Sequence, residues 1–552
     1  MAALHLSRSS VPLHHLLRST PQKCLSTTSS SARSRLESLR SHLKSEPSPL
    51  FPPLLKTKTH LPQSDTIPSP DSYSFHLKTY GCQMNVADSS IVRSVLLNSS
   101  SPLFHEVDDE NADISLTNTC AIRDNAEKKV WNRMYSLRSK EKNKKVEKPQ
   151  ILALLGCMSE RLKSTIFEDK KAKVDVIVGP DAYKDLPRLL SNVLNHQERG
   201  CNTELSFTET YDDVLPVRGK DSITESYISI MRGCNNMCSY CVVPFTRGRE
   251  RSKGLDLIVE DFKRLTGEGV KEITLLGQNV NSYHDRTSLG GVYETSNPGF
   301  KNMYNLRGGG GMYFSDLMDA VSRIDENVRI RFTSPHPKDF PEHLFDLISE
   351  RVNLCNSIHM PAQSGSDTVL ERMRRGYDRD SYIRVVESAR SKIPGVTLSS
   401  DFITGFCRET EEEHIKTLEL MEKVRYDHAF MFKYSMRGKT HAHRKMVDDV
   451  EESVKGRRLE EVIEVFRRNV QEKNEEEELG EERVVLVEGE AKRSTKEKRQ
   501  ITGRTDGNKR VVWDDTKEGN VGEYVKVRIN DVRGHTLRGE EVGRCDIRGN
   551  LE

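Results

Sequence analysis

Hydrophobic and polar positions follow two alternating periods along the chain from about residue 73 onward. Residues 74–80 alternate in the manner of a strand, Gly81 turns the chain, and residues 88–97 carry apolar side chains at helical spacing. Three further apolar runs alternate with helical patterns and predict strands at 114–117, 151–155 and 174–178. This order predicts a small α/β domain over residues 73–195.

The alternation of strand and helix then repeats six times within residues 220–475. The predicted strands are 227–231, 272–276, 328–332, 356–360, 397–403 and 428–434. Helical patterns lie between or after them at 255–266, 313–324, 340–351, 366–374, 378–391 and 410–424. Six successive βα units predict a partial (βα)6 barrel, in which the active site lies at the carboxyl ends of the strands.

Short alternating segments, separated by glycine and charged turns, make up residues 480–545. They predict strands at 483–488, 499–505, 510–513, 523–530 and 536–539. Five short strands indicate a small all-β barrel, so the fold class is α/β with a C-terminal β-barrel. Within the preceding domain, residues 284–312 form a long Gly- and Asn-containing stretch that predicts a flexible surface insertion.

The beginning of the chain has the composition of a targeting segment. No acidic residue precedes Glu37, whereas basic residues are spread among many Ser, Thr and Leu. This composition predicts an organellar transit peptide over residues 1–45. A short amphipathic helix at 4–17 favours the mitochondrion, with the chloroplast as the alternative, and a plain disordered tail also stays open. Residues 46–72 are rich in Pro and Ser, which predicts a linker.

Charge and cysteine content narrow the function classes. The 552 residues include 85 Lys and Arg against 83 Asp and Glu, so any nucleic-acid contact must be local. No run of about 18 apolar residues occurs, which argues against a transmembrane span. Six of the eleven cysteines fall into two sets, which favours metal ligation in a reducing compartment. The others have no partner pattern and are expected to be ordinary core or surface thiols: Cys24, Cys201, Cys355, Cys407 and Cys545.

One cysteine set lies in a single loop after the strand at 227–231. Cys234, Cys238 and Cys241 form a CxxxCxxC array, with Tyr240 between the last two cysteines. A structural zinc takes four ligands in a closed tetrahedron, and no fourth Cys or His lies in this loop. Three thiolates on a cubane iron-sulfur cluster leave one iron open to an outside ligand, so the loop predicts a reactive cluster. A zinc loop or three buried cysteines is the alternative.

The other cysteine set is dispersed along the N-terminal α/β domain. Cys82, Cys120 and Cys157 each follow one of the predicted strands. Because the carboxyl ends of parallel strands share one edge of a sheet, we expect the three side chains to converge there. They therefore predict a second three-cysteine cluster site, with isolated core cysteines as the alternative.

Both sets carry a resemblance to a known family. The array with its tyrosine, CxxxCxYC, resembles the signature of the radical S-adenosylmethionine (SAM) enzymes. The segments around the dispersed cysteines are TYGCQMN, TNTCAIRDNAEKK and LLGCMSER. They resemble the methylthiotransferases, a radical SAM subfamily, in its MiaB-like tRNA branch. The resemblance covers about residues 73–545.

The resemblance implies SAM and two [4Fe–4S] clusters as cofactors. Cys234, Cys238 and Cys241 would hold the cluster that cleaves SAM to a 5'-deoxyadenosyl radical, and the dispersed cysteines would hold the cluster that supplies sulfur. The implied reaction converts N6-isopentenyladenosine, next to the anticodon of a tRNA, to its 2-methylthio derivative. A second SAM would give the methyl group, and a ferredoxin- or flavodoxin-type protein would donate electrons. The C–H bond at adenine C2 has no useful acidity, so cofactor-borne radical chemistry suits it.

Two further residue sets are candidates for ligand contacts. Five polar or aromatic residues are expected to contact SAM: Tyr240, Gln278, Asn279, Gln363 and Asp401. They lie in the cluster loop or beyond later strands, in segments such as LLGQNVNSY, MPAQSGSD and SSDFITGF. Eight basic residues against two acidic ones lie between positions 491 and 510. On a β-barrel they predict contacts with an RNA backbone, and the segment resembles the TRAM domain of tRNA-modifying enzymes. The candidates there are Arg499, Arg504, Lys509 and Arg510. Loop-capping polar residues and a solvated basic turn are the alternatives.

Two segments depart from the family pattern. Cys407 and Arg408 stand where the family commonly has Pro and Gly, and YSMRGKT replaces the common bacterial YSxRPGT. Two other functions also stay open. One is a methylthiotransferase for threonylcarbamoyl adenosine in tRNA or for a ribosomal protein. The other is a binding protein that regulates a kinase, as has been described for eukaryotic relatives.

Overall fold

The computed structural model describes residues 72–121, 124–143, 150–219, 224–287, 299–300, 310–495, 497–515 and 520–551. The predicted transit peptide and all but the last residue of the predicted linker lie outside these ranges. Most of the predicted surface insertion at 284–312 also lies outside them. The ends of that insertion are described, and they pair as a short antiparallel hairpin of β11 (His284–Asp285) and β12 (Met312–Tyr313).

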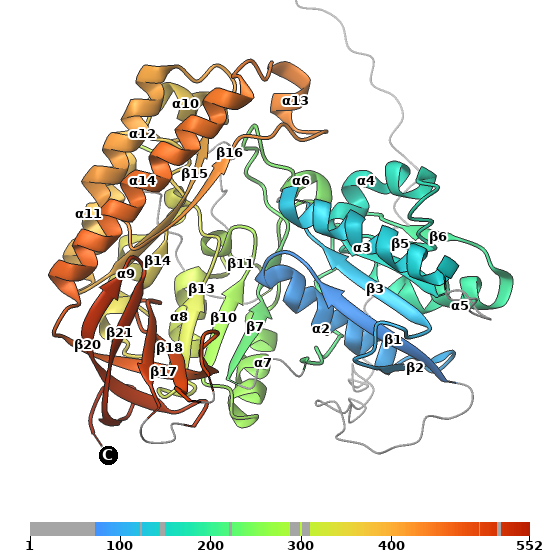
Figure 1. The fold of residues 1–552 in the computed structure, drawn as a ribbon, viewed down its shortest axis with the longest axis horizontal. Coiled ribbons are helices and arrows are strands. Elements are labelled where there is room, and N and C mark those ends of the chain that lie inside the picture. The colour runs from blue at the N-terminus through green and yellow to red at the C-terminus, as the bar shows by residue number, and fades with distance from the viewer. Residues whose placement is uncertain are drawn as a thin grey trace, which may run out of the picture. The chain divides into compact units, whose positions relative to one another are not determined.

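The N-terminal domain is a parallel sheet in the order β2-β1-β3-β4-β5-β6 (blue to teal in Figure 1). Its strands are β1 Ser72–Thr79, β2 Leu103–Glu106, β3 Ile114–Thr119, β4 Ile151–Gly156, β5 Val176–Val178 and β6 Gly200–Asn202. Its helices are α2 Gln83–Leu97, α3 Asp124–Asn143, α4 Cys157–Glu168 and α5 Leu186–His196. Strands β2 and β6 were not predicted from the sequence.

Both faces of this sheet are covered, which explains why the central strand β4 is a continuous apolar run. Ile151, Ala153 and Leu155 of β4 pack into one core together with residues of α2 and α5. Leu152 and Leu154 of the same strand pack into a second core together with α3 and α4. The strands therefore run between two helical layers, and their carboxyl ends share one edge.

The middle domain has strands at all six predicted positions. They are β7 Glu225–Ser229, β10 Glu272–Leu276, β13 Arg329–Phe332, β14 Ser357–His359, β15 Thr397–Thr404 and β16 His428–Lys433. They form two parallel sheets, β7-β10-β13 and β14-β15-β16, and a parallel bridge from Ile330 to Leu354 links β13 to the segment before β14. This is the predicted partial barrel.

Helices enclose the barrel from outside and share its largest core. They are α7 Leu255–Gly267, α8 Phe314–Ser322, α9 Glu342–Glu350, α10 Asp367–Met373, α11 Arg379–Lys392 and α12 Glu411–Val424. The long helix α14 (Glu452–Glu477) follows and also packs into this core through Val462, Phe466 and Val470. No helix in the described ranges is long and apolar enough to cross a membrane.

The C-terminal domain is a closed barrel in the order β17-β18-β19-β21-β20 (red in Figure 1), as predicted. Its strands are β17 Glu482–Glu490, β18 Gln500–Thr505, β19 Arg510–Asp514, β20 Tyr524–Arg533 and β21 Thr536–Arg544. Arginines of β13 dock this barrel: Arg329 Nη1 donates to Arg504 O at 2.7 Å, and Arg331 Nη1 donates to Asp506 O at 2.7 Å.

Candidate active site

The first cysteine set surrounds a tight turn after the short strand β8 (Met231–Arg232), which pairs with β9 (Arg251–Ser252). Gly233 opens the turn with a φ of +76°, and a Cβ there would lie 2.1 Å from Arg249 O. Only glycine fits such an approach. Cys234, Cys238 and Cys241 follow. Burial raises the pKa of the Cys234 thiol, and the charges of Cys241 and Cys238 act in the same direction.

Segments from the far half of the barrel fix this loop. The backbone amide of Ser239 donates to Met373 O at 3.0 Å, and its hydroxyl donates to Arg372 O at 2.8 Å. Arg375 is buried, and its Nη1 donates to Cys238 Sγ at 3.4 Å while its Nη2 donates to Pro361 O at 2.9 Å. A fixed guanidinium thus donates a hydrogen bond to one of the three sulfur atoms of the loop.

The second cysteine set lies at the carboxyl ends of three adjacent strands, as the sequence predicted. Cys82 follows β1, Cys120 follows β3 and Cys157 follows β4, with β3 between the other two. A hydrogen bond with the Cys120 side chain lowers the pKa of Cys82 to about 6, whereas burial raises the pKa of Cys157 and the charge of Cys82 adds to that rise. A Cβ on Gly81 would lie 2.7 Å from Cys120 Cβ, so this glycine lets the end of β1 approach Cys120.

The two cysteine sets face each other. Cys157 packs against Ala121 and against Val242, the residue directly after Cys241. The helix α6 (Val243–Thr246) continues from there and lies beside α4, which begins at Cys157 (Figure 1). Directly after α6, Arg247 donates from Nε to Cys157 Sγ at 3.0 Å. One side chain thus connects the cysteine loop of the barrel to the cysteines of the N-terminal sheet.

Buried ion pairs hold these elements in place. Asp88 of α2 accepts from Arg232 Nη1 at 3.0 Å and from Arg247 Nη2 at 2.7 Å. Asp181 lies 2.9 Å from Arg251 Nη2 and 3.7 Å from Arg232 Nε. We call these five residues the ionic clasp. Its three buried guanidinium groups face two buried carboxylates, and a thiolate at Cys157 would balance the remaining positive charge. Burial raises the pKa of the Cys157 thiol, and the adjacent Arg247 acts in the opposite direction.

The donor sets fit iron-sulfur clusters better than a single ion. In the described part of the chain, no group of three or more His, Cys, Asp or Glu side chains is arranged to hold one metal ion. A cubane differs, because each thiolate ligates a separate iron. Each site here offers three neighbouring thiols and, beside them, N–H donors toward sulfur from Arg247 or Arg375. Such donors tune iron-sulfur clusters.

Among the candidate SAM contacts, Gln278 and Asn279 lie directly after β10. Gln278 Oε1 accepts from the amide of Gly233 at 2.6 Å and so supports the cysteine loop. Asn279 Nδ2 donates to Asp339 at 3.0 Å, whereas its Oδ1 is buried and has no hydrogen-bond partner among the described residues. A buried amide oxygen without a partner is costly unless a ligand donor meets it. This oxygen therefore fits a ligand that brings N–H or O–H groups.

The other candidates lie toward the opposite half of the barrel. The Tyr240 ring packs edge-on against Phe406, with 6.5 Å between centroids, and its hydroxyl lies 3.5 Å from Arg375 Nη1. Gln363 has a φ of +70° and donates its amide to Asp401 O at 2.9 Å. The Asp401 carboxylate lies 3.5 Å from His359 Nε2. Contacts of these residues with SAM remain predictions.

The predicted RNA contacts divide into two pairs. Arg510 is exposed, and the Arg499 side chain is 57% exposed, so both remain candidates. Lys509 does not fit the role, because it is buried with its ammonium 3.0 Å from Asp427 and 2.9 Å from Glu478. Arg504 is also occupied, since its Nη2 lies 2.6 Å from Glu225 and 3.4 Å from Glu272. These two cations join the β-barrel to the parallel barrel, which local composition could not reveal.

Sequence reasoning missed the ionic clasp and Arg375. A signal was present in the flanks of the cysteine loop, where arginines are dense in MRGC and TRGRER. A second signal was Asp88, a charged residue on the helix after Cys82, where the apolar pattern requires a buried face. Unpaired charges do not stay buried, so both signals called for partners elsewhere in the chain.

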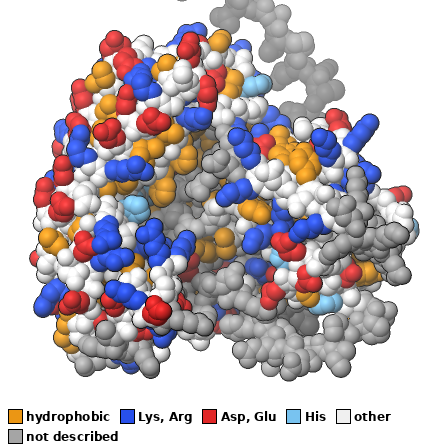
Figure 2. All heavy atoms as spheres, in the orientation of Figure 1, with side chains coloured by type: hydrophobic (Ala, Val, Ile, Leu, Met, Phe, Trp, Pro, Cys, Tyr) orange, Lys and Arg blue, Asp and Glu red, His pale blue; other side chains and the backbone are white. Residues whose placement is uncertain are grey.

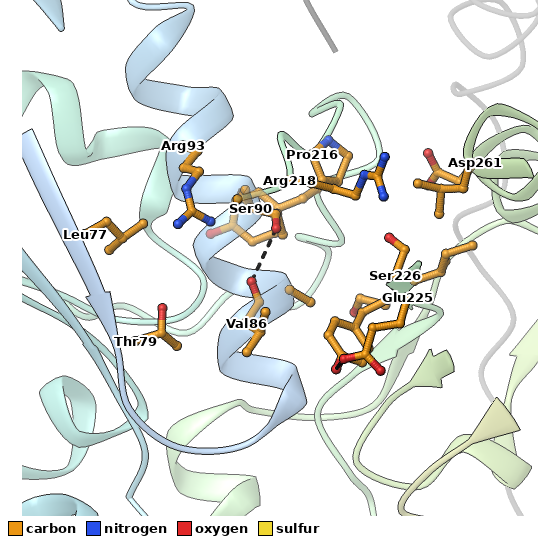
Figure 3. Close-up of a pocket in the computed structure, with 18 of the residues that line it drawn as sticks. Leu77, Thr79, Val86, Ser90, Arg93, Pro216, Arg218, Glu225, Ser226 and Asp261 are labelled. Atoms are coloured by element: carbon orange, nitrogen blue, oxygen red, sulfur yellow. Dashed lines mark hydrogen bonds between the residues drawn. The ribbon is translucent and has the colours of Figure 1, made fainter. Parts of the chain in front are cut away.

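A pocket of about 420 Å³ lies between β1, α2 and β7 (Figure 3). Two charged pairs at its lining are satisfied: Arg93 Nε lies 2.9 Å from Glu106, and Arg218 Nη2 lies 3.0 Å from Glu268. None of its lining residues is a cysteine. The chemistry therefore centres on the facing cysteine sets and not on this pocket.

Comparisons with known proteins agree with this architecture. The chain matches the models of the Radical SAM superfamily over residues 228–421, Uncharacterized protein family UPF0004 over 74–179 and the TRAM domain over 476–542. It is 46% identical over 492 residues to a Mus musculus protein named Mitochondrial tRNA methylthiotransferase CDK5RAP1, covering 86% of this chain and 82% of that protein.

Two other relatives extend the comparison. A Caenorhabditis elegans protein named CDK5RAP1-like protein is 48% identical over 477 residues, covering 85% of each chain. The tRNA-2-methylthio-N(6)-dimethylallyladenosine synthase of Chloroherpeton thalassium is 43% identical over 466 residues, covering 84% of this chain and 95% of that protein. With this identity over most of its length, the chain belongs to the methylthiotransferase family of the radical SAM superfamily.

Proposed function

We propose that this chain is a mitochondrial tRNA methylthiotransferase, which converts N6-isopentenyladenosine next to the anticodon to its 2-methylthio derivative. The observation that carries the proposal is the meeting of the two cysteine sets, in which Cys157 contacts both Val242 and Arg247. A reaction that makes a radical at one cluster and transfers sulfur from another needs the two close together. The names of the relatives supply the tRNA substrate and the mitochondrial location.

In the barrel, Cys234, Cys238 and Cys241 would hold a [4Fe–4S] cluster whose fourth iron is left for SAM. Bound there, the cluster supplies the electron that cleaves SAM. The chain's own residues position it. Gln278 fixes the start of the loop through Gly233, and Arg375 donates a hydrogen bond to Cys238 Sγ.

SAM itself would be held by residues around this loop. Asn279 Oδ1 is a buried acceptor free for a ligand N–H or O–H group. Tyr240, Gln278, Gln363 and Asp401 are the further proposed contacts. Electrons would come from a ferredoxin- or flavodoxin-type protein.

In the N-terminal domain, Cys82, Cys120 and Cys157 would hold the second cluster, which supplies the sulfur. Arg247 hydrogen-bonds Cys157 and is fixed by Asp88, so it orients this thiolate toward the barrel. The exposed Arg499 and Arg510 of the β-barrel would contact the tRNA backbone.

Two triple variants test the division of labour. Replacing Cys234, Cys238 and Cys241 by Ala removes the SAM-cleaving site, so both 5'-deoxyadenosine and methylthiolated tRNA should vanish. Replacing Cys82, Cys120 and Cys157 by Ala should leave 5'-deoxyadenosine formation under dithionite, with about half of the iron and no methylthio product. Chromatography of 5'-deoxyadenosine and nucleoside mass spectrometry of the same tRNA measure both. Methylthiolation that survives loss of the second set would overturn the two-cluster proposal.

The substrate is tested by mass spectrometry of tRNA from a deletion strain. Loss of 2-methylthio-N6-isopentenyladenosine, with accumulation of N6-isopentenyladenosine, is the expected result. Loss of a methylthio group from threonylcarbamoyl adenosine would instead assign the chain to another target. A binding role would be favoured if the deletion strain had a phenotype but unchanged tRNA nucleosides, and if cysteine variants of the protein still restored the normal phenotype.

A further inference from the structure

Two large aromatic side chains are exposed on β16, the edge strand of the sheet β14-β15-β16. Phe430 is 50% exposed and Phe432 is 39% exposed. Their neighbours on the strand, Ala429 and Met431, pack against the main core beneath the helices. Side chains alternate along a strand, so Phe430 and Phe432 point to the opposite face, the inside of the barrel. Figure 2 shows a strip of hydrophobic side chains where Figure 1 places β16.

The strand register connects this face to the cysteine loop. Phe432 is paired with Ile403 of β15, and Phe430 is paired with Asp401, two residues further from the carboxyl end. Ile403 in turn packs in the same cluster as Tyr240 of the CxxxCxYC motif. A continuous surface therefore runs from the cysteine loop down the inner face, with about 7 Å between successive side chains on one strand.

Polar groups complete the lower part of this surface. His359 Nδ1 lies 2.9 Å from Ser399 Oγ, and its Nε2 lies 3.5 Å from Asp401. The His359 ring meets the Phe430 ring edge-on, with 6.3 Å between centroids. We call Phe430, Phe432 and His359 the aromatic wall. It offers flat apolar faces beside hydrogen-bonding groups, which is the chemistry that receives a nucleobase.

We propose that the aromatic wall binds the target base of the tRNA, with the adenine ring stacked on Phe430 and Phe432 and its polar edge toward His359. The inference rests on the proposed function and names the residues that hold its substrate. A base that must react inside a protein is taken out of its stack and received between aromatic or apolar side chains. SAM would bind at the cysteine loop beside Tyr240. The aromatic wall lies further down the same strands, where a second ligand would meet the bound SAM. Phe430 and Phe432 are among the exposed large hydrophobic residues of the described ranges, so their faces are open to a ligand.

The test measures the base-specific part of RNA binding in the reconstituted full-length enzyme with SAM present. Two anticodon stem-loop RNAs are compared, one with adenosine at the target position and one abasic there. Stacking on aromatic side chains changes affinity by roughly 5- to 150-fold per base, so the wild type should prefer the first RNA by a factor in that range. The variant with Phe430→Ala and Phe432→Ala should lose this preference.

Further variants separate stacking from simple packing. Phe430→Leu with Phe432→Leu keeps apolar volume but has no aromatic face, so it should lose most of the preference, whereas Phe430→Tyr with Phe432→Tyr should keep it. Phe207→Ala is the matched control, because Phe207 is 78% exposed in the N-terminal domain and its loss should leave the preference unchanged. Iron content and RNA-free formation of 5'-deoxyadenosine check that each variant is folded.

Each outcome decides the proposal. An Ala variant that keeps the wild-type preference overturns it, and so does a wild type without any preference. A weakened affinity for SAM in the Ala variant overturns it in another way, by assigning the wall to the adenine of SAM. A wild type that shows the preference but leaves isopentenyladenosine unmodified would remove the proposed reaction while the base site stands.

Discussion

Replacing Asp88 by Asn tests whether the ionic clasp holds the two cysteine sets together. The Asp88 carboxylate is fully buried, and guanidinium groups lie at 2.7 and 3.0 Å from its oxygens. Burial alone would raise the pKa of Asp88, but Arg247 and Arg232 outweigh it and hold the pKa below its usual value. Asparagine keeps the shape but leaves Arg247 without its carboxylate and Arg232 with only the longer contact to Asp181. Breaking a buried ion pair in this way costs about 3–5 kcal/mol, so the free energy of unfolding should fall by that amount.

Urea unfolding of the purified protein gives the stability change, and product analysis gives the functional one. Because α2 carries Asp88 and begins directly after Cys82, the variant should still form 5'-deoxyadenosine but make less methylthiolated tRNA. Asp531→Asn is the matched control, since the Arg533–Asp531 pair has side chains 65% and 43% exposed. Exposed pairs contribute about 0–1 kcal/mol. The role of the clasp would be refuted by an Asp88→Asn variant that is as stable as the control and makes as much methylthiolated tRNA per 5'-deoxyadenosine as the wild type.

Four other results are expected. Replacing Arg499 and Arg510 by Ala should weaken tRNA binding and lower the slope of its salt dependence by about one unit per lost phosphate contact. Lys509→Ala should instead lower the midpoint of unfolding, because Lys509 is buried against Asp427. Anaerobic reconstitution should yield about eight iron atoms per chain, and stoichiometric zinc would contradict this. A fluorescent protein fused to residues 1–45 should enter mitochondria, and a cytosolic signal would contradict the transit peptide. Burial acts to raise the pKa of Glu413, but hydrogen bonds from Arg372 and Thr368 lower it from 4.5 to about 2. The wild type should therefore lose stability as pH falls from about 4.5 toward 2. Urea titrations of Glu413→Gln should lack this loss of stability.

The barrel strands could be predicted because each has apolar residues, alternating or continuous, between strong helical patterns. For β10, prediction and structure agree at both ends, and all five of its side chains are buried. Strands β2 and β6 could not be predicted, since they have four and three residues and few buried side chains. Pairing with β1 and β5 makes them strands, and such pairing is a tertiary effect.

The convergence of Cys82, Cys120 and Cys157 was predictable from topology alone, because each follows a strand of one parallel sheet. What joins this set to the other was not predictable. Asp88 and Arg247 are separated by 159 positions, and nothing local to either residue indicates the other. Lys509 was predicted to lie in a surface patch because its sequence neighbours are basic. Its ammonium is instead paired in the interior with Asp427 and Glu478.

Cys407 and Arg408, which depart from the common family pattern, have defined contacts in the loop after β15. Arg408, at the position where glycine is common, has a φ of +62°, the left-handed region that costs a non-glycine residue about 1–2 kcal/mol. Its backbone amide donates to Asp449 at 2.8 Å, which holds that conformation. Cys407 is buried in one cluster with Phe406 and Tyr434. Phe406 packs edge-on against the ring of Tyr240, so the loop after β15 contacts the cysteine motif, while the strained Arg408 is exposed.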